Sequence, residues 1–262
     1  MELTMTLPPE LEVYQEKILE SKVSYIRALP DEERPTLPWE SKVGGLPYLP
    51  EGTPSPMAPD GSPLFLLAQL NFSDIPPLPS FPTEGLLQFF IHDDDSYGLN
   101  FDDPFDQSRF RAVYYKDIIR DEDALEPGRH IGDSHHYLPI DPRKSYPLRF
   151  ERAVEVVQPQ DFHFNKIMGT NFFDQFGAQK WELLHQFGQA VRSHRHKIGG
   201  YAHFTQDDPR NPELPMELLF QLGSDEAIQC MWGDMGVANF FICREALERL
   251  DFSNVMYNWD CY

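Results

Sequence analysis

Residues 42 to 45 read Lys-Val-Gly-Gly, and residues 197 to 200 read Lys-Ile-Gly-Gly. The segments that follow each block also match in order and spacing, and the offset falls only from 155 to 142 residues along the chain. Repetition at a nearly constant offset is the mark of an internal duplication. Three further pairs of segments carry this repetition: 66–70 with 218–222, 85–91 with 236–242, and 110–115 with 252–257.

Each half is predicted to begin with a helix and to continue with strands. Residues 10–29 place Leu11, Tyr14 and Ile18 near helical spacing, and Phe173 to Phe187 repeats the pattern in the second half. The repeated blocks are short runs of apolar, branched and aromatic residues between turn residues, which is typical of strands. We therefore expect an α+β, mainly β fold with antiparallel strands.

The two halves are predicted to form one domain. We place the repeats at about 8–120 and 160–262, and the connector at 121–159 as an ordered linker or a sheet edge. A strand-rich half exposes an apolar face and sheet edges, and packing against its copy covers both. The expected architecture is a β-roll-like unit with a pseudo-two-fold axis. The proline-rich stretches 47–63 and 75–82 should form loops, because proline lacks the amide that a strand ladder needs.

Composition narrows the partner without naming it. The chain has 262 residues with 22 basic and 42 acidic side chains, a formal charge of −20. Such a charge repels nucleic acid and anionic membranes. A role in solubility explains most of it, and a basic protein partner is the alternative. Its three cysteines form no disulfide or zinc pattern, and residues 64–68 are the longest apolar run, too short to span a bilayer. We expect a cytoplasmic protein without a cofactor, whose oligomeric state the sequence leaves open.

Several motifs together resemble a known family. They include Ser41 to Pro47, Leu67 to Leu70, His196 to Tyr201, Phe204 to Arg210, and Met231 to Asp234 with Asn239 to Ile242. In these segments the chain resembles the bacterial YwqG-like family over most of its length. The resemblance implies a mainly β, roll-like fold with helical additions and a function that is unknown. It implies no catalytic residue. Ala202 departs from the proline expected after Gly-Gly-Tyr, which concerns a turn.

The paired glycines favour a structural role. Glycine supplies positive φ angles or permits close approach of a neighbouring strand, and both halves use it at the same place. The alternative is a loop whose amides bind an anion beside Lys42 or Lys197. No glycine-rich nucleotide motif is present, so nucleotide binding has no support.

Two clusters contain residue types that can bind metals. Asp93, Asp95 and Gly98 match part of an EF-hand loop, but Tyr97 and Pro104 break the pattern. A divalent-cation site of another type remains an alternative, since crowded carboxylates favour a cation among them. Its ligands would be Asp93, Asp95, Asp102 and Asp103. The histidines at 135–136 and 194–196 lack the spacing of a zinc site.

The strongest candidates for ligand binding lie on both sides of the second double glycine and in a later polar turn. Polar residues crowd the end of a predicted strand, where rigid scaffolds carry binding sites. The simpler interpretation is a capped Asp-Pro turn with an ion pair. The candidates are His196, Lys197, Gln206, Asp207, Asp208, Arg210, Trp232 and Asp234.

Three functions are compatible with these features, and the sequence identifies no catalytic residue. The first is a non-enzymatic binding or regulatory protein, for example an immunity-type protein that neutralises a basic toxin. The second is an enzyme of unassigned class with a polar site at the junction of the halves. The third is a cation-binding protein.

Overall fold

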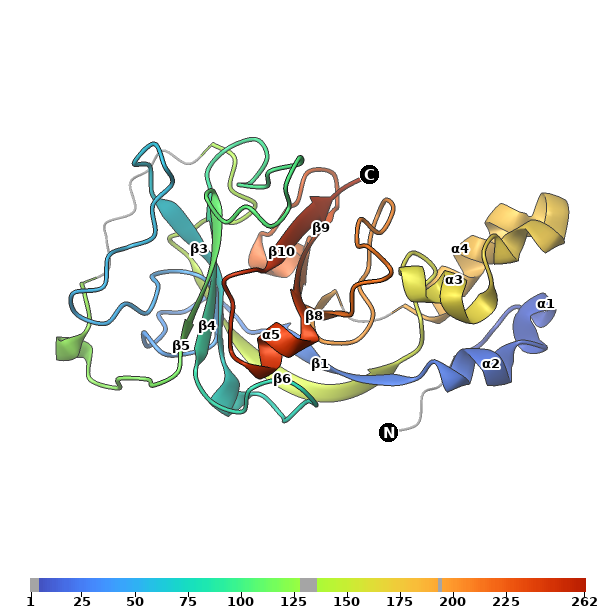
Figure 1. Cartoon of the computed structure of the whole chain (residues 1–262), viewed down its shortest axis with the longest axis horizontal. Coiled ribbons are helices and arrows are strands. Elements are labelled where there is room, and N and C mark those ends of the chain that lie inside the picture. Colours follow the sequence, from blue (N-terminus) through green and yellow to red (C-terminus); the bar gives the residue numbers. More distant parts are fainter. Residues whose placement is uncertain (1–4, 128–135, 193–194) are drawn as a thin grey trace.

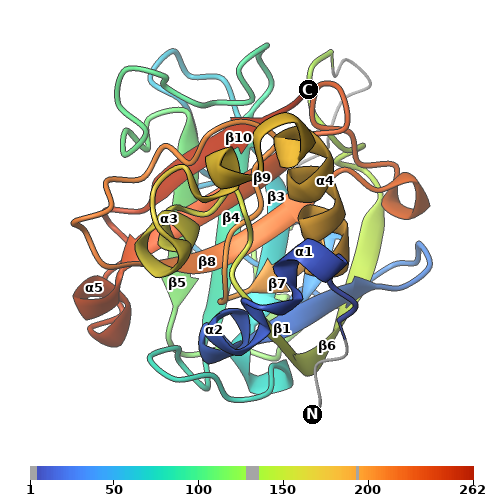
Figure 2. The same cartoon turned by 90° about the vertical axis from the view of Figure 1, so that its right-hand side faces the viewer.

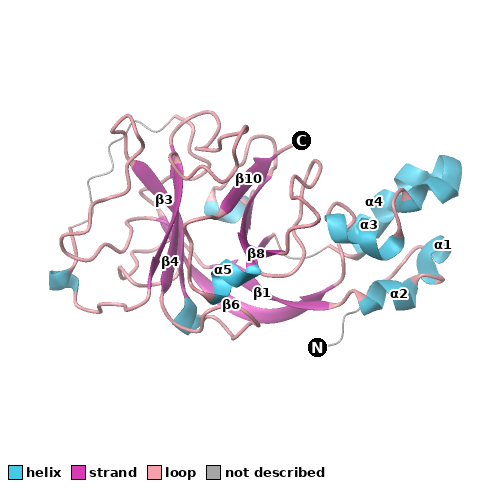
Figure 3. Cartoon of the chain, in the orientation of Figure 1, coloured by secondary structure: helices cyan, strands magenta, loops and turns pink. Residues whose placement is uncertain are grey.

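The computed structural model describes residues 5–127, 136–192 and 195–262. Within them the chain is mainly β, with ten antiparallel strands and a few short helices (Figure 3). The strands are β1 Val23–Pro30, β2 Lys42–Gly44, β3 Leu64–Asn71, β4 Leu86–His92, β5 Phe110–Tyr115, β6 Ser145–Glu155, β7 His196–Ile198, β8 Met216–Gly223, β9 Val237–Cys243 and β10 Met256–Asp260.

All ten strands belong to one curled sheet, in the order β10-β9-β8-β7-β1-β6-β2-β3-β4-β5. β1 and β6 pair over eight residues at its centre. The strands β3 to β5 and β8 to β10 rise from this central pair as two wings (Figure 1). The sheet nearly closes, because Tyr257 N at one edge donates to Pro104 O (2.9 Å), in the loop that precedes the other edge strand.

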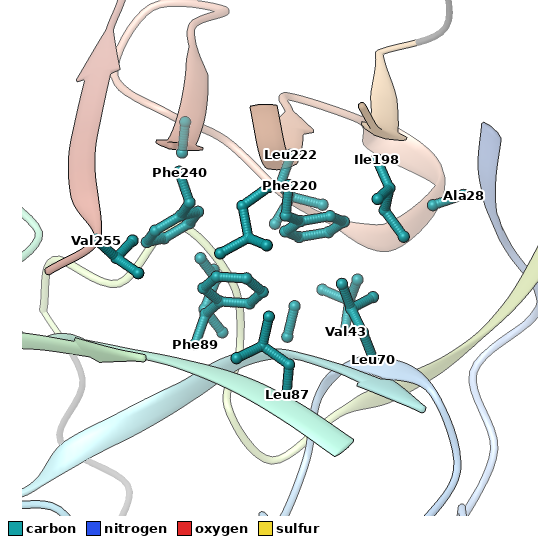
Figure 4. Close-up of a cluster of buried hydrophobic side chains, with 14 of the residues drawn as sticks. Ala28, Val43, Leu70, Leu87, Phe89, Ile198, Phe220, Leu222, Phe240 and Val255 are labelled. Carbon is teal, nitrogen blue, oxygen red and sulfur yellow. The ribbon is translucent and has the colours of Figure 1, made fainter. Parts of the chain in front are cut away.

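The main hydrophobic core lies between the two wings. Figure 4 shows Phe89 and Leu87 of β4 facing Phe220 and Phe240 from the opposite wing. The ring centroids of Phe89 and Phe240 are 4.5 Å apart, and all four side chains are almost completely buried. Burial of apolar surface from both halves therefore stabilises the curled sheet.

The helices α1 to α4 lie together at one end of the molecule. α1 Pro9–Glu12, α2 Gln15–Glu20, α3 Phe162–Met168 and α4 Lys180–Ala190 lie together in Figure 2. They enclose a second core that contains Phe164, Phe173 and Phe187. The remaining helical pieces are η1 Phe72–Asp74, η2 Glu122–Ala124, η3 Phe172–Gln179, η4 Glu226–Ile228 and α5 Arg244–Glu248.

Both double glycines turn the chain away from the sheet. Gly44 and Gly45 have φ angles of +69° and +74°, and Gly199 and Gly200 have +70° and +77°. These left-handed conformations strain any residue with a Cβ atom. The prediction that the glycines supply positive φ is confirmed.

Buried side-chain amides hold the segment after each double glycine. Gln69 of β3 accepts a hydrogen bond from Tyr48 N (3.0 Å), and Gln221 of β8 accepts one from His203 N (2.9 Å). A side-chain amide of the next strand then donates to the carbonyl of Tyr48 or His203, at 2.9 Å in each case. The two segments are thereby fixed against the sheet by matching contacts.

The helix predicted over residues 10–29 is wrong in its second part. α2 ends at Glu20, where the Ser21 hydroxyl donates to Ile18 O (2.5 Å), and residues 23–30 form β1. Pairing of β1 with β6 on one side and β7 on the other outweighs the local helical spacing. The second predicted helix is present as η3 and α4, with a break at Gly177.

The segment 121–159 is not an edge or a linker throughout. Residues 145–155 form β6, an eleven-residue strand between β1 and β2 at the middle of the sheet. Its apolar residues are separated by charged ones, which weakened the strand signal. The proline-rich stretches 47–63 and 75–82 lie outside the named strands, as predicted.

Candidate functional site

A cavity of about 720 Å³ opens where Gly199-Gly200 ends β7. β7 pairs with only two residues of β1 and two of β8. Residues 23–24 of β1 and 216–217 of β8 therefore flank the cavity. Leu78 to Phe81 from the first half and part of α3 complete its walls. The volume lies in the range of small-ligand sites, and both halves contribute to it.

A buried ion pair lies beneath the double glycine. Lys197 Nζ donates to both carboxylate oxygens of Glu155, at 3.0 and 2.8 Å, and also to Tyr201 O. Both side chains are almost completely buried. A Cβ atom at Gly200 would collide with the Glu155 carboxylate, so glycine is required there for a second reason.

Arg210 forms the other half of the buried network. Its guanidinium bonds Asp161 at 2.7 Å and Asp208 at 2.6 Å, and only 4% of the residue is exposed. Asp161 also accepts the Ala202 amide (3.0 Å), which ties the chain after the double glycine to the start of α3. The guanidinium carbon lies near three ring centroids, those of Phe162 (4.6 Å), Phe204 (5.6 Å) and Phe241 (4.5 Å).

The network carries an excess of negative charge when every group is ionised, with three carboxylates and two cations. Burial would raise the pKa of Asp161, but hydrogen bonds from His163 and the charge of Arg210 outweigh it and lower that pKa. Burial lowers the pKa of Lys197, against the opposing attraction of Glu155 and Asp161. Of these five residues only Arg210 lines the cavity, so the surplus carboxylate charge lies behind the cavity wall.

One titratable ring faces the cavity directly. His163 lines it, its Nδ1 lies 2.6 Å from Asp161 Oδ1, and 39% of its side chain is exposed. A carboxylate that orients a histidine in this way is also a feature of acid–base catalytic sites. The pair is local, however, since Asp161 caps α3 and also accepts the backbone amide of His163.

The structure brings three of the eight ligand-binding candidates together: Lys197, Asp208 and Arg210. His196 is buried and contacts Asp225 at 3.0 Å. The side-chain amide of Gln206 donates to Cys261 O (2.9 Å), and its backbone N–H donates to the Asp260 carboxylate.

The last three candidates also lie outside the network. Asp207 is exposed. Trp232 is buried in an aromatic cluster, with its ring 5.3 Å from that of Tyr97, and exposed Asp234 accepts the Tyr262 amide through its backbone carbonyl (3.2 Å). This turn does not line the cavity beside Gly199-Gly200.

Sequence reasoning missed Glu155, Asp161 and His163. Glu155 stands inside the apolar run 154–157, and a single carboxylate in such a run is a usable signal of a buried ion pair. Asp161 precedes α3 as its N-cap, and an aspartate before a helix is explained by that role alone. Its contact with Arg210 could therefore not be inferred from its position. Long-range pairing of this kind leaves no spacing pattern.

The acidic candidates for a cation site have other contacts. Asp93 accepts the backbone amides of His136 (3.3 Å) and Tyr137 (2.8 Å), and Asp103 accepts that of Phe105 (3.1 Å). Asp95 and Asp102 are exposed. Among the described residues, no three side chains of His, Cys, Asp or Glu are grouped as metal ligands. A cation site there stays a prediction, which calcium or magnesium calorimetry tests. His135 and His194 lie outside the described residues.

Fold and site together define a mainly β protein with a ligand-sized cavity above buried ion pairs. Residues 41–261 match the family described as a domain of unknown function, DUF1963, and the chain therefore belongs to that family. The match contains both double glycines and the whole buried network. The comparison with curated proteins gave no match. In the part of the chain that the structure describes, no helix has the length and hydropathy needed to cross a bilayer.

Proposed function

We propose that this protein is a non-enzymatic binding module for a basic protein, and that the cavity beside Gly199-Gly200 holds a lysine or arginine side chain of that partner. The observation that carries the proposal is the excess negative charge of the buried network behind the cavity wall, which consists of Glu155, Asp161, Lys197, Asp208 and Arg210. Buried carboxylates that outnumber the cations around them attract a further cation and repel an anion.

The cavity walls suit the two parts of such a side chain. Leu78, Phe81 and Leu214 offer apolar surface to its methylene groups. Three basic side chains also line the cavity, and each has a partner. Lys166 donates to Pro212 O, Arg244 pairs with Glu217, and Arg210 pairs with Asp161 and Asp208. The formal charge of −20 supports rapid encounter with a basic partner.

Rigid ion pairing favours binding over chemistry at the cavity floor. Lys197 and Arg210 each bond two or more acceptors, so neither is available as a nucleophile or acid without breaking buried contacts. The Asp161–His163 pair supports a second candidate function, an acid–base enzyme. That hypothesis predicts that the protein converts a component of a metabolite extract and that His163→Gln does not, as followed by mass spectrometry.

We also infer that the two halves arose by duplication and form one domain with a pseudo-two-fold axis. Supporting observations are the palindromic strand order, the matching amide contacts, and a register shift in the β3–β4 pair (Leu66/Ala68) and the β8–β9 pair (Leu218/Phe220). The register aligns Tyr115 with Asp260, so the predicted match of 110–115 with 252–257 needs a three-residue correction. The YwqG-like resemblance and a cytoplasmic location stay predictions.

Capture of partners from cytosol tests the binding function. Ser24 is exposed and lines the cavity, so Ser24→Trp fills it without removing a buried contact. Asn254→Trp adds the same ring at an exposed turn that lines none of the three cavities described for the chain. We expect the wild type and Asn254→Trp to retain a basic protein at low salt, and Ser24→Trp to lose it.

Salt provides the second criterion, because screening weakens attraction between opposite charges. The captured protein should dissociate progressively as ionic strength rises from about 0.05 to 0.5 M. Retention of the same proteins by Ser24→Trp, or capture of acidic proteins only, would contradict the proposal.

A further inference from the structure

The first double glycine also borders a cavity, of about 480 Å³, and one buried lysine lines it. Lys42 begins β2, and only 1% of the residue is exposed. Its Nζ donates one long hydrogen bond, 3.5 Å, to Leu37 O. Within residues 5–127, 136–192 and 195–262, no carboxylate oxygen lies within 4 Å of that nitrogen in an ion pair, which is unusual because buried charges are normally paired.

Lys197 shows what such a lysine does in the other half. Lys42 lies opposite Gln69, and Lys197 lies opposite Gln221, so the two lysines hold matching places before their double glycines. The ammonium group of Lys197 donates to both oxygens of the Glu155 carboxylate and to Tyr201 O. The same arrangement around Lys42 lacks this partner.

The strand register indicates the segment that stands in place of the glutamate. Ile26 pairs with Ile198, and Tyr146 pairs with Val43, so Ile26 and Tyr146 are matching positions on β1 and β6. Glu155 follows Tyr146 by nine residues, and Pro35 follows Ile26 by nine. Pro35 lines the cavity and has no carboxylate. β1 ends at Pro30, and Arg34 N donates to Ser145 O (3.1 Å), so the place that Glu155 fills in one half falls at Pro35 or Thr36 in the other, and neither residue is acidic.

We propose that the cavity beside Gly44-Gly45 binds a small carboxylate, whose oxygens pair with Lys42 as Glu155 pairs with Lys197. The Thr36 and Ser145 hydroxyls, 2.9 Å apart, lie near the double glycine, and Ser145 shares the cavity wall with Thr36. Burial lowers the pKa of Lys42 to about 8, against the charge of Glu40, so the free ammonium is poorly solvated. An anionic ligand stabilises the charged form of this poorly solvated ammonium group.

The other charged side chains around this cavity limit the ligand. Arg34 pairs with Glu40, Arg143 with Asp141, and Glu33 with Lys144. The remaining lining acids are Glu122 and Glu126, and the Glu126 carboxylate accepts the Gly52 amide. A carboxylate with a cationic far end satisfies Lys42 and meets these acids, whereas a polyanion meets repulsion.

Binding of 4-aminobutanoate tests the proposal directly. The Lys42 side chain is followed by nuclear magnetic resonance during titration at constant ionic strength, with butylammonium as the matched probe that lacks a carboxylate. We expect saturable shifts with 4-aminobutanoate alone, and Kd should rise about tenfold per pH unit above the pKa of Lys42. Equal response to butylammonium, or no response to either probe, overturns the proposal.

Two variants locate the carboxylate. Pro35→Glu supplies an internal carboxylate, so it should raise the pKa of Lys42 and weaken 4-aminobutanoate binding at least about tenfold. Pro35→Gln is the uncharged control and should bind within about twofold of wild type, since it leaves the lysine unpaired. Lys42→Met should lose binding, followed by calorimetry, and it decides the matter if Pro35→Glu does not fold. Undiminished binding by Lys42→Met overturns the proposal.

Discussion

Lys42 and Lys197 are matched in position but differ in how the protein accommodates their charge. Lys197 contacts a carboxylate that lies on the central strand β6, with both carboxylate oxygens within 3.0 Å. Lys42 is just as buried, yet it has one long hydrogen bond and a cavity beside it. The comparison shows that a lysine before a double glycine can form a structural ion pair or stay without a carboxylate partner, depending on a residue that lies far away in the sequence.

Removal of Lys197 should have the largest effect. Lys197→Met leaves the Glu155 carboxylate buried without its cation, and breaking such a pair lowers the free energy of unfolding by about 3 to 5 kcal/mol. Denaturant unfolding measures the loss. The double variant Lys197→Met, Glu155→Leu should recover most of it, because no uncompensated charge remains. A loss below about 1 kcal/mol in the single variant would mean that the pair is not isolated from water.

Alkaline pH should separate the two lysines next. The pKa of Lys42 is lowered to about 8, below the unfolded value of 10.5, so the unfolded chain binds more protons between these values. Wild-type stability relative to Lys42→Met therefore rises with pH across that window, by on the order of 3 kcal/mol. At pH 7 we expect Lys42→Met to be the more stable protein.

Unfolding of both proteins at pH 7, 9 and 10.5 measures this difference. The comparison with the variant cancels the titration of other groups that the two proteins share. A constant difference across the window would show that Lys42 keeps an ordinary pKa and that its charge is solvated.

The buried glutamines offer a smaller contrast between the halves. Gln69 makes four side-chain hydrogen bonds, including one to the side chain of Gln88, whereas two are observed for Gln221. Each buried polar group left without a partner is worth about 1 to 3 kcal/mol. We expect Gln69→Met to lose about 3 kcal/mol and Gln221→Met about half as much, by denaturant unfolding. The reverse order would indicate that the second half depends more strongly on its amide contacts.

Local sequence patterns carried much of the fold but little of the site. The strands at residues 64–71, 86–92, 216–223 and 237–243 follow from apolar runs, and the double glycines follow from their need for positive φ. The strands β1 and β6 were not predicted, because their local patterns are helical or mixed. Their pairing with each other decides their structure. The partners of Lys197 and Arg210 were not predicted for the same reason. Glu155 and Asp161 are far from them in the sequence, and only the folded chain brings them into contact.

The smallest loss of stability is expected for an ion pair that is exposed to water, even though it lies beside the same cavity. Arg244 and Glu217 border the same cavity as the Lys197 network, and Arg244 Nε donates to Glu217 at 2.6 Å. The Arg244 side chain is 57% exposed, so water replaces the contact when it is lost. Arg244→Met should change the free energy of unfolding by less than about 1 kcal/mol, measured with denaturant beside Lys197→Met. A loss that approached that of Lys197→Met would mean that the cavity rim excludes water, and the contrast between buried and exposed pairs would fail.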